Sequence, residues 1–411
     1  MKMEKLGKYC KIISGYAFKS NDLSEGTEIP VIKIGNISNG DDVITDSSTQ
    51  YVSSDFLSID EKYHIKKGDV LISLTGSHIN QPNSMVGRSC RNFSDTEFLL
   101  NQRAGKVIPN ENADKNYLYY LLNTESFKYS ICNRAYGAAN QANVSPSDIE
   151  NIKWNFPPLP TQQKIASILS AYDNLIQNYK KQIEALQTAA SELYKEWFVR
   201  FRFPGYQTTN FENGIPEGWK VERIGALYDS TSGGTPSREH EEYFQNGTYP
   251  WIKTGELKDS PILETEESIT DEAIKHSSAK LFEKDSLIIA MYGATIGQLG
   301  INKMKAACNQ ACCVLRPKKD KAFGIYYLFH FFKENREFII GLGNGAAQQN
   351  LSQVLINKLK IVNPNKEILE IFEKKESLFF EKIYHLQKQI TNLTQQRDLL
   401  LPRLMSGKLE V

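Results

Sequence analysis

Pairs of carboxamide side chains recur at matching places in the two halves of this chain. Asn101 and Gln102 stand in "LLNQRAGKVIP" (99–109), and Asn309 and Gln310 stand in "AACNQACCVLRP" (306–317). An amide presents a donor beside an acceptor, which matches the major-groove edge of adenine. The same groups also tie down backbone turns, and residues shared by both halves favour that scaffold role. Both interpretations stay open, also for the second set of amides, Asn140, Gln141, Gln348 and Gln349.

Residues that differ at matched places are better candidates for reading two different base sequences. In the comparison of the two halves, Ser77 and His78 correspond to Ala294 and Thr295, and Arg103 corresponds to Ala311. Arginine is the usual reader of guanine, and hydroxyl groups can contact any base. The candidates of this kind are Ser77, His78, Arg103, Tyr292 and Thr295.

A glycine-rich polar loop and several cations could contact phosphate groups. The loop holds Gly233, Gly234, Thr235, Ser237 and Arg238, and its backbone N–H groups could approach a phosphate closely. An ordinary turn is the equal alternative. A basic run at 301–321 could form one local positive face, although a solvated charge run explains it as well. The cationic candidates are Lys19, Arg88, Lys253, Lys303 and Lys305.

Composition excludes several classes of protein. The net charge of +1 excludes a polycation, and no apolar run reaches the ~18 residues that a membrane span needs. The first residues lack the apolar segment of a signal peptide, and the six cysteines show no CxxC pair. We therefore expect a cytoplasmic protein with buried thiols and no metal site.

Enzyme motifs are missing from the sequence. It contains no GxxxxGK[ST], HExxH or GxSxG pattern, and its six histidines are scattered. "NFPP" (155–158) has the wrong order for the loop of an adenine methyltransferase. "GLGNG" (341–345) follows a predicted helix, whereas a cofactor-binding glycine loop follows a strand. We expect a protein without a catalytic site.

Two long segments free of Gly and Pro must position these residues. The first runs from Thr161 to Phe203 and the second from Asn365 to Leu401, each after a proline. Apolar residues recur at steps of 3 and 4, which predicts two helices with a coiled-coil stripe. At ~1.5 Å per residue, 40 residues make a rod of roughly 60 Å. The first stripe is Ile165, Leu169, Tyr172, Ile176, Tyr179, Ile183, Leu186, Ala190, Leu193 and Trp197; the second is Phe372, Phe379, Ile383, Leu386, Ile390, Leu393 and Leu400, interrupted by Glu376 and Arg397.

The chain is an internal duplication. A shift of 207 residues places Pro157 on Pro364 and Ile176 on Ile383, and "EIPVIKIGNI" (28–37) matches "TYPWIKTGEL" (248–257). Short β-branched runs separated by Gly, Asn and Ser turns predict a sheet-rich domain in each half. Tyr119, Tyr120, Tyr326, Tyr327 and Trp251 are expected in the cores, and Trp197 with Phe198 should anchor the first helix to one of the domains or to a partner subunit.

We therefore predict an α+β fold with two related sheet-rich domains. Two long antiparallel coiled-coil helices join them, with internal pseudo-two-fold symmetry. The expected boundaries are 1–156 for the first domain, 157–204 for the central helix, 205–363 for the second domain and 364–411 for the C-terminal helix. In this arrangement the helices act as a spacer between two heads.

The sequence resembles the specificity subunits of type I DNA restriction-modification systems. "PPLPTQQKIASILSAYDNLIQNYKKQIEALQTAASELYKEWFVRF" (157–201) is similar to their central region, and "LTQQRDLLLPRLMSGKLEV" (393–411) to their C-terminal end. "SGYAFKS" (14–20), "SGGTPSREHEEYF" (232–244), "YPWIKTGEL" (249–257) and "YGATIGQLGI" (292–301) resemble parts of their target-recognition domains. The resemblance covers nearly the whole chain, in the family's domain order.

The resemblance implies a non-catalytic subunit that binds double-stranded DNA. Each domain would read one half of a bipartite, asymmetric site, and the helices would set the gap and dock two methyltransferase subunits. S-adenosylmethionine would bind to those partners, and ATP and Mg²⁺ to restriction-translocase subunits, with no cofactor on this chain. The alternative is a coiled-coil adaptor whose two heads bind protein, which the neutral net charge slightly favours.

Overall fold

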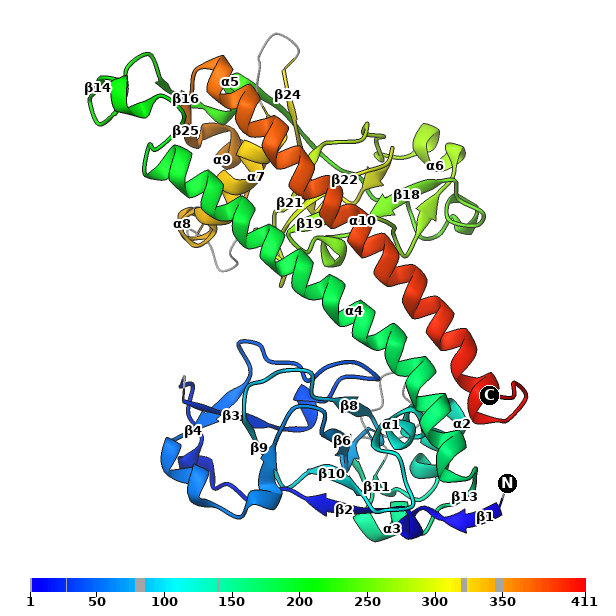
Figure 1. The fold of residues 1–411 in the computed structure, drawn as a ribbon. Coiled ribbons are helices and arrows are strands. Elements are labelled where there is room, and N and C mark those ends of the chain that lie inside the picture. Colours follow the sequence, from blue (N-terminus) through cyan, green and yellow to red (C-terminus); the bar gives the residue numbers. More distant parts are fainter. Residues whose placement is uncertain (1, 27, 78–85, 139–140, 319–323, 344–349) are drawn as a thin grey trace. The chain divides into compact units, whose positions relative to one another are not determined.

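The computed structural model describes residues 2–26, 28–77, 86–138, 141–318, 324–343 and 350–411 (Figure 1). The chain divides into two compact units. Unit 1 comprises Met1–Gln177 and Asn392–Val411, and unit 2 comprises Asn178–Thr391. Each of the two long helices, α4 (Leu159–Tyr194) and α10 (Lys366–Met405), therefore contributes one segment to each unit.

In the part of unit 1 that the structure describes, short strands are accompanied by three α-helices besides α4 and α10. Its main sheets have the orders β2-β10-β6-β8, β4-β3-β9-β5 and β11-β12-β7, and β1 pairs with β13. The helices are α1 (Lys115–Asn123), α2 (Glu125–Cys132) and α3 (Pro146–Glu150). The strands are β1 (Lys2–Lys5), β2 (Cys10–Ser14), β3 (Ile29–Ile32), β4 (Gln50–Val52), β5 (His64–Ile65), β6 (Val70–Ser73), β7 (Thr75–Gly76), β8 (Ser89–Arg91), β9 (Phe98–Leu100), β10 (Ala104–Pro109), β11 (Tyr136–Ala138), β12 (Gln141–Asn143) and β13 (Lys153–Phe156).

Unit 2 repeats this plan with a larger central sheet. The orders are β17-β24-β21-β22-β19 and β20-β18-β23, with the pairs β14-β15 and β16-β25. The helices are α5 (Ile224–Leu227), α6 (Asp271–His276), α7 (Ile325–Glu334), α8 (Arg336–Leu342) and α9 (Gln353–Lys358). The strands are β14 (Phe211–Glu212), β15 (Ile215–Pro216), β16 (Lys220–Arg223), β17 (Tyr228–Ser232), β18 (Tyr249–Ile252), β19 (Ser260–Ile262), β20 (Ser268–Ile269), β21 (Leu287–Ala290), β22 (Leu299–Asn302), β23 (Ala307–Cys308), β24 (Cys312–Pro317) and β25 (Lys360–Asn363).

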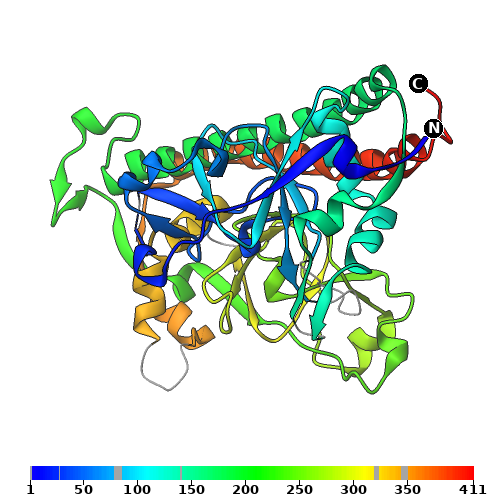
Figure 2. The same ribbon diagram turned by 90° about the horizontal axis from the view of Figure 1, so that it is seen from below.

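The two units share one topology, which confirms the predicted duplication. The antiparallel order β2-β10-β6-β8 in unit 1 corresponds to β17-β24-β21-β22 in unit 2. In each unit the first strand of the repeat pairs with the strand just before a long helix, β1 with β13 and β16 with β25. In Figure 1 and Figure 2, β1 (blue) and the C-terminal end of α10 (red) lie toward the same end of unit 1.

The predicted helical stripes are buried in part. The side chains of Ile165, Leu169 and Ile176 are buried in unit 1, and those of Ala190, Trp197, Phe372, Ile383 and Leu386 in unit 2. Within unit 2 the two helices run antiparallel, because Tyr194 packs on Phe372 while Ala190 and Ile383 line one small cavity. The other stripe residues are half-buried: Tyr172, Tyr179, Ile183, Leu186, Leu193, Phe379, Ile390, Leu393 and Leu400.

The stripes merge with the cores of the units. Ile165 and Leu169 pack among Tyr117–Leu122 of α1, and Trp197 and Phe198 join the core of unit 2. Of the two predicted anchoring partners for Trp197 and Phe198, the structure shows packing against a domain, unit 2. The predicted core tyrosines, Trp251 and all six cysteines are buried, the cysteines as free thiols. The α+β class of the fold is thus as predicted.

Candidate nucleic-acid interface

In unit 1 most of the predicted contact residues meet at one end of the central sheet. The turn that holds Asn101 and Gln102 precedes β10, and Gln102 N donates to Tyr16 O, just beyond β2. The Leu74 N–H donates to Arg103 O at 3.0 Å, which brings the segment after β6 to the same place. We call this end, residues 15–16, 74–77, 87–88 and 100–103, the amide end of unit 1. Gln102 and Arg103 are exposed there, and Ser77 is half-buried.

Unit 2 builds the same end from different residues. Met291 N donates to Ala311 O at 2.8 Å, and Gly234 N donates to Cys308 O at 2.9 Å. The amide end of unit 2, residues 233–235, 291–297 and 308–311, thus gathers the segments next to β17, β21 and β24. It holds the predicted residues Gly233, Gly234, Thr235, Tyr292, Thr295, Asn309 and Gln310, with Gln310 and Tyr292 exposed.

Each asparagine of the matched pairs is tied to its own turn. Asn309 Oδ1 accepts from Ala311 N at 3.2 Å, and Asn101 Oδ1 accepts from Arg103 N at 3.4 Å. Their N–H groups donate to the equivalent carbonyls of Ile252 and Ile32, both at 3.0 Å. These contacts support the scaffold role for the two asparagines. The glutamines beside them have exposed side chains, and that of Gln310 contacts Thr235.

The glycines of the loop before β18 are required by packing. A Cβ on Gly233 would lie 2.2 Å from Asn309 O, and one on Gly234 would lie 2.2 Å from Ser278 O. In unit 1 a Cβ on Gly15 would likewise lie 2.3 Å from Leu100 O. Real Cβ atoms do not come this close to backbone oxygens, so the loops can seat against the amide turns only with glycine at these positions.

Two of the predicted cations beside the amide end of unit 2 are paired with acids. Arg238 donates to both carboxylate oxygens of Glu267, at 2.6 and 3.1 Å, and its guanidinium lies 4.2 Å from the centre of the Phe244 ring. Lys253 Nζ lies 2.6 Å from Glu266 and 3.0 Å from Glu267. The hydrogen bonds that Lys253 donates to these two carboxylates raise its pKa. A phosphate group would therefore have to displace an acid from each cation.

Lys303 and Lys305 lie at the other end of the sheet. They follow β22, which begins near the amide end and runs away from it. Lys303 Nζ contacts Asp285 at 2.9 Å and Glu381 of α10 at 2.8 Å, and its side chain is only 7% exposed. Lys305 is more exposed and pairs with Glu283. This placement separates both lysines from the other candidates.

The remaining described candidates differ in exposure. Lys19 and Ser237 are exposed, and Arg88 is half-buried just before β8. Burial, together with the charge of Arg88, lowers the pKa of Lys128 on α2 to about 8, so Arg88 is close to α2. His78, Asn140, Gln348 and Gln349 lie outside the described residues.

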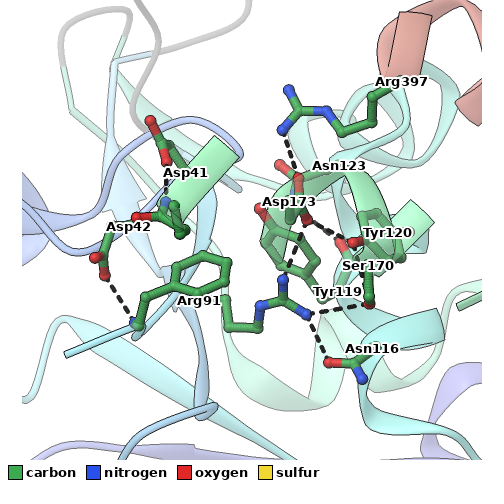
Figure 3. A network of polar contacts seen from close by, with 12 residues as sticks. Asp41, Asp42, Arg91, Asn116, Tyr119, Tyr120, Asn123, Ser170, Asp173 and Arg397 are labelled. Carbon is green, nitrogen blue, oxygen red and sulfur yellow. Dashed lines mark hydrogen bonds and ion pairs between the residues drawn. The ribbon is translucent and has the colours of Figure 1, made fainter. Parts of the chain in front are cut away.

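A buried ion cluster that the sequence patterns did not indicate lies at the opposite end of the unit 1 sheet (Figure 3). Asp173 of α4 accepts from Arg91 at 3.2 Å, from Arg397 of α10 at 2.8 Å and from the Tyr120 hydroxyl. Arg91 also donates to Asn116 at 2.7 Å. The Arg91 and Asp173 side chains are 5% and 4% exposed. Only the interruption of the second stripe by Arg397 hinted at this cluster.

The family follows from comparison with known proteins. A family model described as "Type I restriction modification DNA specificity domain" matches residues 1–188 and again residues 216–398. This chain belongs to that family. The double match coincides with the two sheet-rich repeats, and the function that follows is DNA sequence specificity without catalysis by this subunit.

Individual relatives agree with this assignment. The specificity subunit of the type I restriction enzyme MjaIX from Methanocaldococcus jannaschii is 30% identical over 76% of this chain and 73% of its own. The HindI specificity subunit from Haemophilus influenzae is 24% identical over 85% of this chain and 88% of its own. The crystal structure of the S subunit from M. genitalium shares the fold, with a TM-score of 0.62 and 16% identity over 98% of this chain and 95% of that one.

The described part of the chain shows neither a group of metal ligands nor a membrane-spanning helix. Among the residues that the structure describes, no three His, Cys, Asp or Glu side chains are grouped so as to hold a metal ion. None of the helices described is both long and apolar enough to cross a bilayer.

Proposed function

We propose that each unit of this specificity subunit reads one half of a bipartite DNA site through its amide end. The observation that carries this proposal is the recurrence of one framework with different exposed side chains. Gln102 and Arg103 are exposed at the amide end of unit 1, whereas Gln310 and Tyr292 are exposed at that of unit 2. Because the two sets differ, the two half-sites differ and the whole site is asymmetric.

A division of labour within each amide end follows from the contacts. Asn101 and Asn309 hold the turns, while the exposed side chains next to them reach base edges. The cations that contact phosphate groups are Lys19, Arg88, Lys253 and Arg238. These contacts position the duplex but do not depend on its base sequence. The backbone of the loop at 233–237 approaches the duplex in unit 2, and Ser77 and His78, which correspond to Ala294 and Thr295 of unit 2, are further candidates in unit 1. The family assignment favours this role over a protein-binding adaptor.

The test is an exchange of one recognition domain. Residues 205–363 are replaced by the corresponding segment of a relative, and the chimera is expressed with its methyltransferase partner. Sequencing of methylated adenines should show one altered half-site and one unchanged half-site. A change in both halves, or in neither, would refute independent reading by the two units.

The partners supply the chemistry. We propose that two methyltransferase subunits dock on α4 and α10 and transfer a methyl group from S-adenosylmethionine to adenine, and that restriction-translocase subunits use ATP and Mg²⁺. Exposed apolar residues one heptad apart on α10, Ile371 and Leu378, support helix docking. A Leu378→Glu variant should lose copurification with the methyltransferase, whereas Lys374→Glu should retain it. The buried free thiols are in keeping with a cytoplasmic complex.

A further inference from the structure

The ion cluster around Asp173 has an apolar counterpart in unit 2. The 207-residue shift that relates the repeats places Asp173 on Phe380 and Ala190 on Arg397. The same shift relates Tyr119 to Tyr326, whose ring lies 4.6 Å from that of Phe380. Phe380 and Ala190 are 3% and 1% exposed and line one small cavity, just as Asp173 and Arg397 meet in unit 1.

Arg91, the third charged residue of the cluster, also corresponds to an apolar residue in unit 2. Arg91 pairs with Val70 in the ladder of β8 and β6, and Ile301 pairs with Leu287 in the ladder of β22 and β21. Val70 and Leu287 occupy equivalent registers, opposite Val107 and Leu315. An arginine, an aspartate and an arginine in unit 1 therefore correspond to isoleucine, phenylalanine and alanine in unit 2.

This asymmetry discriminates between possible helix pairs. When α4 pairs with α10, Asp173 meets Arg397 and Phe380 meets Ala190. Opposite charges thus meet at one site, and two apolar side chains meet at the other. If α4 paired with α4 of a second copy, Asp173 would meet Ala190 and lose one of its two guanidinium partners in a buried place. If α10 paired with α10 of a second copy, the Arg397 charge would meet the Phe380 ring and its apolar surroundings. Both are unfavourable, because a buried charge without its partner is strongly destabilising.

We propose that the ion pair between buried Asp173 and half-buried Arg397 selects the pairing of α4 with α10 and rejects pairing of like helices from two copies. Each helix pair then brings together one copy of each recognition domain, instead of two identical ones. A buried polar group at a single coiled-coil position is an established means of fixing partner choice. This selection concerns assembly alone and can be measured without DNA. Its test is therefore independent of the proposed reading of half-sites.

A swap of the two helix residues tests the proposal in the full chain. The Ala190→Arg, Arg397→Ala double variant keeps the composition and moves the arginine from α10 to α4. When α4 pairs with α4 of a second copy, Asp173 then lies opposite the introduced arginine. When α10 pairs with α10, Phe380 lies opposite an alanine. Pairing of α4 with α10 instead leaves Asp173 opposite an alanine and the introduced arginine opposite Phe380. Light scattering after size-exclusion chromatography should show a monomer for the native chain and a dimer for the double variant. A double variant that stays monomeric with native thermal stability would overturn the proposal.

A second variant covers the case in which the swap fails to fold. Arg91→Ile, Asp173→Phe, Arg397→Ala gives unit 1 the apolar set of unit 2, so like helices no longer bury an unpaired charge. Two differently tagged copies are coexpressed, and one tag is used for purification. We expect at least tenfold more of the second tag to be recovered with this triple variant than with the native chain. Glu376→Gln, which alters a buried group of α10 that pairs with α7, should give the native result. Equal recovery from the triple variant and the native chain would refute selection by this cluster.

Discussion

His330 Nε2 lies 2.9 Å from a carboxylate oxygen of Glu376, and both side chains are completely buried between α7 and α10. Burial raises the pKa of Glu376 from 4.5 to about 8 and lowers that of His330 from 6.5 to about 3. Both shifts favour the neutral forms, so the pair holds a protonated carboxyl group and a neutral imidazole at neutral pH. Tyr194 stacks on the imidazole, which completes the apolar surroundings.

The first prediction concerns the pH dependence of stability. A carboxyl group with a raised pKa in the folded state contributes stability below its unfolded pKa and loses it as the pH rises through the folded value. The free energy of unfolding should therefore fall between pH 5 and pH 8, by up to about 1.4 kcal/mol per pH unit from Glu376. Glu373, whose pKa burial raises to about 7, adds to this fall below pH 7. His330 acts in the opposite sense below its unfolded pKa of 6.5, because only the unfolded chain then protonates its imidazole.

Glu376→Gln isolates the contribution of this carboxyl group. Glutamine mimics the protonated acid, so urea unfolding at pH 5, 6, 7 and 8 should give a flatter curve for the variant. Glu370→Gln, an exposed change on the same helix, is the control and should follow the native curve. A native-like slope in Glu376→Gln would show that the carboxyl group is ionised throughout this range.

The second prediction concerns the glycine loop of unit 2. Gly233→Ala places a Cβ against the Asn309 carbonyl, so the loop or the amide turn must move. We expect a loss of about 2–4 kcal/mol in the free energy of unfolding, as for other overpacked positions. Gly255→Ala, where a Cβ would meet nothing within 4 Å, should be nearly neutral. Denaturant unfolding measures both, and equal stabilities would show that the loop adapts freely.

The third prediction concerns the acids that neutralise the amide end of unit 2. Glu266→Gln, Glu267→Gln releases Lys253 and Arg238 for phosphate groups. Non-specific affinity for duplex DNA should rise, and the slope of log K against log salt should steepen by about 1 to 2. Fluorescence anisotropy with a random duplex at low and at raised salt, with the methyltransferase present, measures this. Glu283→Gln frees Lys305 at the opposite end and should leave the slope unchanged; an equal effect there would place DNA elsewhere.

The fourth prediction separates Lys303 from the DNA-contacting cations. Lys303→Met breaks a nearly buried pair with Asp285 and Glu381, so it should lower the free energy of unfolding by about 1–3 kcal/mol. Its salt slope in DNA binding should equal that of the native chain. Arg103→Ala, at the exposed amide end of unit 1, should instead keep native stability and alter recognition of one half-site. Thermal unfolding and binding to matched and mismatched duplexes distinguish these outcomes.

The long helices and the duplication could be predicted from the sequence because both depend on local patterns. Steps of 3 and 4 residues between apolar side chains, without Gly or Pro, specify a helix with one buried face wherever that helix packs. The match of Pro157 with Pro364 needed no coordinates. The core tyrosines, the buried thiols and the α+β class followed from the same kind of reasoning.

The tertiary structure decided which chemistry each residue can perform. Lys303 and Asn309 are close in sequence, yet they lie at opposite ends of a sheet because the chain turns between β22 and β24. Asp173 looks like a surface residue of an amphipathic helix until Arg91 and Arg397, distant in sequence, enclose its charge. Burial and pairing are sums over such long-range contacts, and a local pattern of residue types carries no information about them.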